Sequence, residues 1–225
     1  MASASPSVSP SPGAIVAGPT LTGSLGAAAR QHGGSLARAW LNVKAVLVCD
    51  VSDSMSEQDA GLKRSGGEIR DRRSRWDACC EELARLQVQH PGKTAIVAFS
   101  SHATLALGGR LPPPSGGTNL AGALDYVHSL LEPEATGITV IVLSDGEPND
   151  EAEALAAGRK LVRLGAKLEA VYVGPEGQTD GRVFLARLAG LSGAIPHTAY
   201  RGGAGGVLNT ALTPLLADRS AEATK

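Results

Sequence analysis

Short, nearly continuous apolar segments alternate with longer segments of helical periodicity along most of this chain. The apolar segments are rich in β-branched residues, as in strands buried on both faces of a parallel sheet, and they span residues 43–49, 94–99, 137–143 and 168–173. The segments that follow them carry apolar residues at three- and four-residue spacing, which is typical of helices, and span residues 68–89, 119–131, 150–164 and 183–191. Strands that alternate with helices predict a doubly wound, Rossmann-like α/β fold with helices on both faces of the sheet.

Two shorter segments complete the predicted sheet. Residues 103–107 are expected to form the hairpin partner of the strand that precedes them, and residues 197–200 a last edge strand. We therefore expect a central, mostly parallel sheet of about six strands. A terminal helix is predicted over residues 207–216.

The 225 residues suit one domain with flexible ends. Residues 1–34 are rich in Ser, Pro, Gly and Ala with almost no charge, so they are predicted to be a disordered arm. Residues 35–217 are predicted to be the folded domain, with Trp40 docking on its edge, and residues 218–225 a flexible tail.

Composition limits the function classes. The formal net charge of −1 argues against a general polyanion binder, so nucleic acid is not an expected partner. Three cysteines do not make a disulfide framework and point to a reducing compartment, and the adjacent Cys79 and Cys80 are expected to pack within a helix. No stretch reaches the roughly 18 apolar residues that a membrane span needs, and Met1–Pro12 lacks the features of a secretory signal. We expect a cytoplasmic protein that does not contact a membrane.

Three separated segments place oxygen-bearing side chains where predicted strands end. Asp50, Ser52 and Ser54 follow the first strand, Asp145 follows the strand at 137–143, and Thr118 lies in a Gly-Gly-Thr-Asn turn. In open parallel sheets, ligands bind at the carboxyl ends of the strands. Two carboxylates and three hydroxyls are ligands for a hard divalent cation, Mg²⁺ first and Mn²⁺ or Ca²⁺ otherwise. Because this set does not close the shell, waters or a partner's carboxylate must complete it.

The two predicted metal carboxylates should interact unfavourably without a cation. At about 5 Å and an effective dielectric near 20, their repulsion is on the order of 3 kcal/mol. A bound cation reverses this penalty. In its absence, one carboxylate is expected to protonate or the loops to loosen.

The three segments resemble a known site when they are taken in order. Asp50-Val-Ser52-Asp-Ser54-Met55, Ser-Gly-Gly-Thr118-Asn-Leu and Leu-Ser-Asp145-Gly are similar to the three-part metal-ion-dependent adhesion site of von Willebrand factor type A (vWA) domains. The resemblance extends from about Asn42 to Leu216. It implies that Ser52, Ser54 and Thr118 ligate the metal directly, and that Asp50 and Asp145 do so directly or through waters.

The resemblance also implies a function without catalysis. A partner protein's Glu or Asp would take the open metal position, and the lack of a signal favours the intracellular branch, whose members often work with AAA+ ATPases. The layout resembles bacterial stand-alone members, and identical subunits are a further candidate partner. One departure is Asp53, where the family usually has Gly. Asp tolerates a left-handed backbone better than most residues, so the turn is expected to survive.

Two other functions fit parts of the pattern. A haloacid-dehalogenase-like phosphohydrolase would use Asp50 as nucleophile, but its usual second Asp is replaced by Ser52, which has no nearby base. A scaffold would keep the cation only for stability.

Three features near the site have simpler explanations. The basic residues are expected to form a solvated helix start rather than a nucleic-acid or acidic-partner surface, and they are Lys63, Arg64, Arg70, Arg72, Arg73 and Arg75. Asp150 is expected to cap the third helix, and Glu147 to tune the choice of partner.

Overall fold

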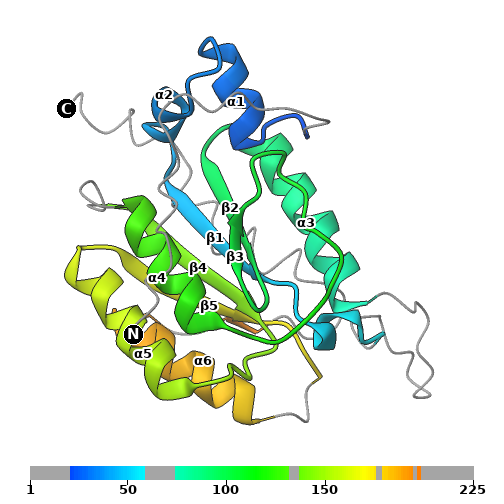
Figure 1. Ribbon diagram of the computed structural model, residues 1–225, viewed down its shortest axis with the longest axis vertical. Coiled ribbons are helices and arrows are strands. Elements are labelled where there is room, and N and C mark those ends of the chain that lie inside the picture. The colour runs from blue at the N-terminus through cyan, green and yellow to red at the C-terminus, as the bar shows by residue number, and fades with distance from the viewer. Residues whose placement is uncertain (1–20, 59–73, 132–136, 176–178, 195–196, 199–225) are drawn as a thin grey trace, which may run out of the picture.

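A six-stranded sheet organises the fold (Figure 1). The computed structural model describes residues 21–58, 74–131, 137–175, 179–194 and 197–198. The strand order is β3-β2-β1-β4-β5-β6, and only the β2–β3 pair is antiparallel. The strands are β1 (Ala45–Asp50), β2 (Thr94–Phe99), β3 (Ala103–Leu105), β4 (Thr139–Ser144), β5 (Lys167–Tyr172) and β6 (His197–Thr198). This confirms the predicted mostly parallel, doubly wound α/β fold.

Helices cover both faces of the sheet. They are α1 (Leu25–Gln31), α2 (Leu36–Trp40), the 3-10 helix η1 (Asp53–Ser56), α3 (Arg75–Gln89), α4 (Leu120–Leu131), α5 (Glu151–Arg163) and α6 (Asp180–Gly190). Figure 1 shows α3 on one side of the sheet and α4, α5 and α6 on the other. None of the helices in the described ranges is long and apolar enough to cross a membrane.

The sequence of strand β1 is almost entirely apolar because both of its faces are buried. All six residues are buried, and alternate side chains enter different cores. Val46 and Val48 pack in the core with α4, α5 and α6, whereas Leu47 and Cys49 pack in the core with α3. Cys79 is buried and Cys80 half-buried on α3, as predicted.

The predicted disordered arm of residues 1–34 is wrong at its end. Residues 25–31 form α1, which Ser24 caps by accepting a hydrogen bond from the Ala27 amide at 3.1 Å. Leu25 and Ala29 are buried in the core, and the Gly26 amide donates to the Leu107 carbonyl at 2.8 Å. A small-residue composition resembles a linker, but one leucine and three alanines suffice to pack this short helix. Residues 1–20 lie outside the described part of the chain.

Helix α3 differs from its predicted form at its start. It begins at Arg75 behind a capping box of Ser74 and Asp77, while residues 68–73 of the predicted helix lie outside the described ranges. Trp76 is half-buried, and its indole N–H donates to the Pro112 carbonyl at 2.8 Å. The predicted terminal helix at 207–216 and the tail also lie outside the described residues.

Candidate metal centre

The topology brings the three predicted segments to one end of the sheet. Strands β1 and β4 are parallel neighbours, with Cys49 opposite Leu143. Asp50, the last residue of β1, and Asp145, which follows β4, therefore lie at the same edge of the sheet. A pocket of about 290 Å³ lies there, and its walls include Ser52, Ser54, Thr118 and Asp145. The fifth predicted residue, Asp50, is buried and does not line this pocket.

Asp50 is held in place by two donors. Its Oδ1 accepts a hydrogen bond from the Ser52 amide at 2.8 Å, and its Oδ2 accepts one from the Ser144 hydroxyl at 2.6 Å. Burial raises the pKa of Asp50 from 3.8 to about 6, while the hydrogen bonds from Ser144 and Ser52 oppose this rise and the charge of Asp145 adds to it. Burial therefore raises the pKa of Asp50 more than the charge of Asp145 does, so the repulsion between the two aspartates is the smaller effect. The Ser144 hydroxyl, which that argument did not use, also accepts from the Gly146 amide at 2.9 Å.

Ser52 and Ser54 point to a common place. Their hydroxyl oxygens lie 3.1 Å apart, and Ser52 is buried while Ser54 is half-buried. Asp53 begins the 3-10 helix η1 with its side chain exposed, and its amide donates to the Gly116 carbonyl at 3.1 Å. A 3-10 helix is right-handed, so replacing the family's usual Gly with Asp requires no left-handed backbone at this position.

The loop that carries Thr118 is fastened by Asn149. The Asn149 amide donates to the Thr118 carbonyl at 2.9 Å, and the Thr118 amide donates to the Asn149 Oδ1 at 3.1 Å. Gly116 has a φ of 79°, which glycine adopts at little cost, and lets the chain turn into the site. Next to this clamp, Asp150 caps α5 as predicted, accepting from the Glu153 amide at 2.8 Å.

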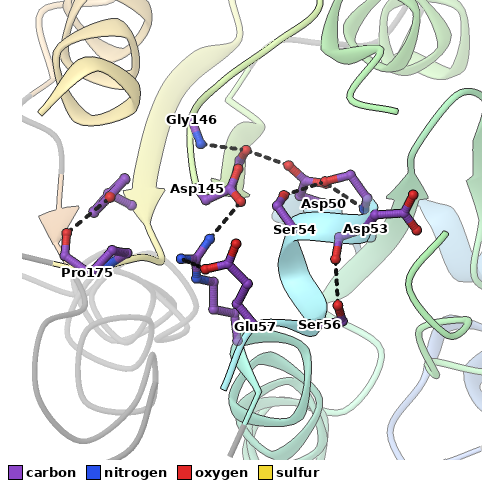
Figure 2. A network of polar contacts seen from close by, with 12 residues as sticks. Asp50, Asp53, Ser54, Ser56, Glu57, Asp145, Gly146 and Pro175 are labelled. Carbon is purple, nitrogen blue, oxygen red and sulfur yellow. Dashed lines mark hydrogen bonds and ion pairs between the residues drawn. The ribbon is translucent and has the colours of Figure 1, made fainter. Parts of the chain in front are cut away.

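Arg75 enters the same pocket and corrects the prediction of a solvated basic cluster. Its side chain is 2% exposed, and its NH1 lies 2.9 Å from the Asp145 Oδ2 while its NH2 lies 2.8 Å from the Glu57 Oε2. Figure 2 shows Glu57 and Asp145 converging on this position. The other five basic residues of the cluster lie outside the described ranges. A run of positive charges in sequence does not reveal which member will turn inward.

The donor set fits a small divalent cation. Neighbouring ligands of an octahedral Mg²⁺, at about 2.1 Å from the ion, lie about 3 Å apart, which matches the spacing of the Ser52 and Ser54 hydroxyls. Each Asp50 oxygen that accepts a protein hydrogen bond keeps a second lone pair. Within the described residues no three His, Cys, Asp or Glu side chains form a metal-ligating group, so an ion here would need hydroxyls and water in addition to the two aspartates.

The close packing behind Asp145 predicts a sensitive position on α6. A Cβ added at Gly181 would lie 2.1 Å from the Asp145 carbonyl oxygen, so the loop or the helix must shift. We expect Gly181→Ala to lower the free energy of unfolding by about 1–3 kcal/mol and to weaken Mn²⁺ binding, measured by thermal melts and electron paramagnetic resonance. Gly190→Ala is the control, because a Cβ added at Gly190 would have nothing within 4 Å. Equal effects of the two variants would contradict this account.

The arrangement of sheet, helices and pocket defines an α/β protein with the vWA fold, as in its structural neighbours. No protein-family model matches the sequence, and no curated protein does. An aerotolerance-related membrane protein from Bacteroides fragilis is 16% identical with a TM-score of 0.55, the match covering 77% of this chain and 98% of that one. The manganese-loaded TRAP protein of Plasmodium vivax is 17% identical with a TM-score of 0.54, over 77% of this chain and 73% of that one.

A third neighbour is larger than this chain. It is a mutant of the PilB minor pilin from Streptococcus sanguinis, 15% identical with a TM-score of 0.54, and the match covers 78% of this chain and 60% of the pilin. At these identities the likeness concerns the fold alone.

Proposed function

We propose that this protein is a metal-dependent protein-interaction module, which binds an acidic residue of a partner through Mg²⁺. The observation that carries the proposal is the gathering of three chain segments into one pocket of oxygen donors at the carboxyl ends of β1 and β4. The metal would be held by Asp50, Ser52, Ser54, Thr118 and Asp145, which makes the site an intact adhesion site in the sense of the vWA resemblance. When bound, the ion supplies an electrophilic position that attracts an external carboxylate.

The five residues would have different tasks. Ser52, Ser54, Thr118 and Asp145 line the pocket and are placed as ligands. Asp50 is buried behind these ligands and accepts a hydrogen bond from the Ser52 amide. Its carboxylate would bind the metal directly or through a water. Neutral hydroxyls leave more of the ion's charge uncompensated than carboxylates would, which supports recognition of an anion.

Mn²⁺ and Ca²⁺ are the alternative ions in this proposal. The manganese-loaded neighbour from Plasmodium vivax supports the idea that a protein of this fold can hold a divalent cation. Mg²⁺ remains our first choice because hard oxygen donors make up the whole set.

The buried position of Asp50 supports binding rather than catalysis. A phosphohydrolase nucleophile must reach its substrate, whereas both oxygens of Asp50 accept internal hydrogen bonds and the residue is 1% exposed. Ser52, at the place of that family's second Asp, is also buried. We therefore keep a non-enzymatic role in the proposal.

The proposed context is an intracellular, cytoplasmic assembly of a bacterial stand-alone type. An AAA+ ATPase or identical subunits are the candidate partners, and neither nucleic acid nor a membrane is needed. The reducing compartment that the free cysteines favour supports this placement.

Removing one pocket hydroxyl tests the metal site directly. We expect Thr118→Ala to weaken Mn²⁺ binding on the order of 10-fold, measured by electron paramagnetic resonance with Mg²⁺ as competitor. Ser115→Ala is the matched control, since this exposed serine of the same loop does not line the pocket. Absence of Mn²⁺ uptake by the wild-type protein would refute the proposal, and so would partner capture that is equal in Mg²⁺ and in EDTA.

A further inference from the structure

Arg75 is the unusual component of this pocket. It is a buried cation in the wall of a site that is proposed to hold another cation. Its guanidinium is shared, with NH1 on Asp145 and NH2 on Glu57. The two carboxylates differ in exposure: the Asp145 side chain is 7% exposed and the Glu57 side chain is 59% exposed. Glu57 is therefore the partner that can leave into water at little cost.

The charges of the pocket indicate when Glu57 should leave. Asp50, Asp145 and Glu57 together carry three negative charges when ionised, which Arg75 and a divalent ion balance, and the exposed carboxylates of Asp53 and Glu147 add further negative charge to the pocket wall. A partner's carboxylate entering the pocket would therefore add to an excess of negative charge in a partly desolvated place. If Glu57 turns out to solvent as the carboxylate enters, the negative charge of the pocket does not increase.

The geometry of Arg75 suits the incoming group. A guanidinium presents its N–H groups as a planar fork that matches a carboxylate, which a point charge cannot do. Glu57 contacts the NH2 end of this fork, and both residues line the same pocket as the metal donors. An external carboxylate that reaches the metal is thus within the same cavity as the NH2 group.

We propose, on the basis of the metal-dependent function above, that Arg75 is a second anchor for the partner's carboxylate and that Glu57 occupies this anchor until the partner replaces it. The partner's acid then meets two cations, the metal and the guanidinium. Glu57 sets the affinity by competition. Arg75 is a specificity-determining residue that selects a carboxylate over a neutral oxygen ligand.

Acetate and Mn²⁺ provide a test that needs no identified partner. The full chain is loaded with Mn²⁺, and acetate binding is measured by the paramagnetic broadening of its methyl proton signal. We expect Glu57→Gln to tighten acetate binding about threefold, as for release of an exposed ion pair, with Mn²⁺ affinity changed less than twofold. Arg75→Lys, which keeps the charge but loses the fork, should weaken acetate binding about fivefold without loss of Mn²⁺.

Glu147→Gln is the matched control. Glu147 is an exposed carboxylate of the same pocket wall, so this variant removes the same charge and leaves the contact between Glu57 and Arg75 in place. Tighter acetate binding in Glu57→Gln alone supports the inference. Equal effects of the two glutamine variants, or none, overturn it while Mn²⁺ binding by the wild type still supports the proposed function. A wild-type protein that takes up no Mn²⁺ overturns both.

Discussion

Replacing Asp50 by asparagine is expected to abolish Mg²⁺ binding and at the same time to stabilise the metal-free protein. Asp50 is 1% exposed, and its burial raises the pKa of its carboxyl from 3.8 to about 6. This rise in pKa corresponds to roughly 3 kcal/mol of destabilisation of the charged form. Asn removes the charge, and its side chain can still accept from the Ser52 amide and donate to the Ser144 hydroxyl. We expect a gain of about 2 kcal/mol at pH 7, or roughly 4–8 °C in melting temperature in EDTA.

The same carboxylate gives the metal-free wild type a defined pH dependence. Between pH 4 and pH 6 the folded state binds a proton at Asp50 more tightly than the unfolded state does, because the folded pKa is the higher one. The contribution of this group to stability therefore increases as pH falls from 7 toward 4, and decreases as pH rises. This contribution to the pH dependence of stability should be absent in Asp50→Asn. In the wild type, Mg²⁺ affinity should decrease below about pH 6, since protons and metal compete for Asp50.

Asp53→Asn is the control for both effects. Asp53 is three residues away, at the start of η1, but it is exposed, so its neutralisation should change the melting temperature in EDTA little. In saturating Mg²⁺ the order of stability should reverse, because an ion at 100 times its dissociation constant adds about 2.7 kcal/mol to the wild type and nothing to Asp50→Asn. A lower melting temperature of Asp50→Asn than of the wild type in EDTA would show that the buried Asp50 charge does not destabilise the metal-free protein.

The positions of Asp50 and Asp145 could be predicted because they depend on topology. Buried runs mark β1 and β4, parallel strands present their carboxyl ends at one edge, and the residues after each strand must meet there. The hydroxyls of Ser52 and Ser54 followed from their spacing in one turn. None of these inferences required knowledge of side-chain contacts.

The supporting residues could not be predicted, since their roles arise from contacts between distant segments. Arg75 and Asp145 are 70 positions apart, and Thr118 and Asn149 are 31 apart. In sequence Arg75 is one of six nearby basic residues, and Asn149 is one polar residue of a loop. Helix α1 could not be predicted for a different reason: its composition is that of a linker, and only its packing against α2 and the core distinguishes it.

Replacing Arg75 by methionine is expected to destabilise the metal-free protein strongly and to increase its affinity for Mg²⁺. Without the guanidinium, the Asp145 carboxylate loses a 2.9 Å ion pair while it stays largely buried. Removal of one partner from a buried pair typically costs about 3–5 kcal/mol. Loss of a positive charge beside the metal position also removes a repulsion of a few kcal/mol at an effective dielectric near 20. We expect Mg²⁺ to bind roughly 10- to 100-fold more tightly, measured by calorimetry.

A second substitution separates charge from packing in this variant. Adding Asp145→Asn to Arg75→Met removes the stranded carboxylate, so most of the lost stability should return, and the double-mutant cycle should show a coupling of at least about 2 kcal/mol. The double variant should nevertheless bind Mg²⁺ more weakly than Arg75→Met, because a proposed ligand is gone. Since excess Mg²⁺ can replace the missing guanidinium as the counter-charge of Asp145, the ion should raise the melting temperature of Arg75→Met more than that of the wild type. An equal rise in both proteins would show that Arg75 and the metal do not share Asp145.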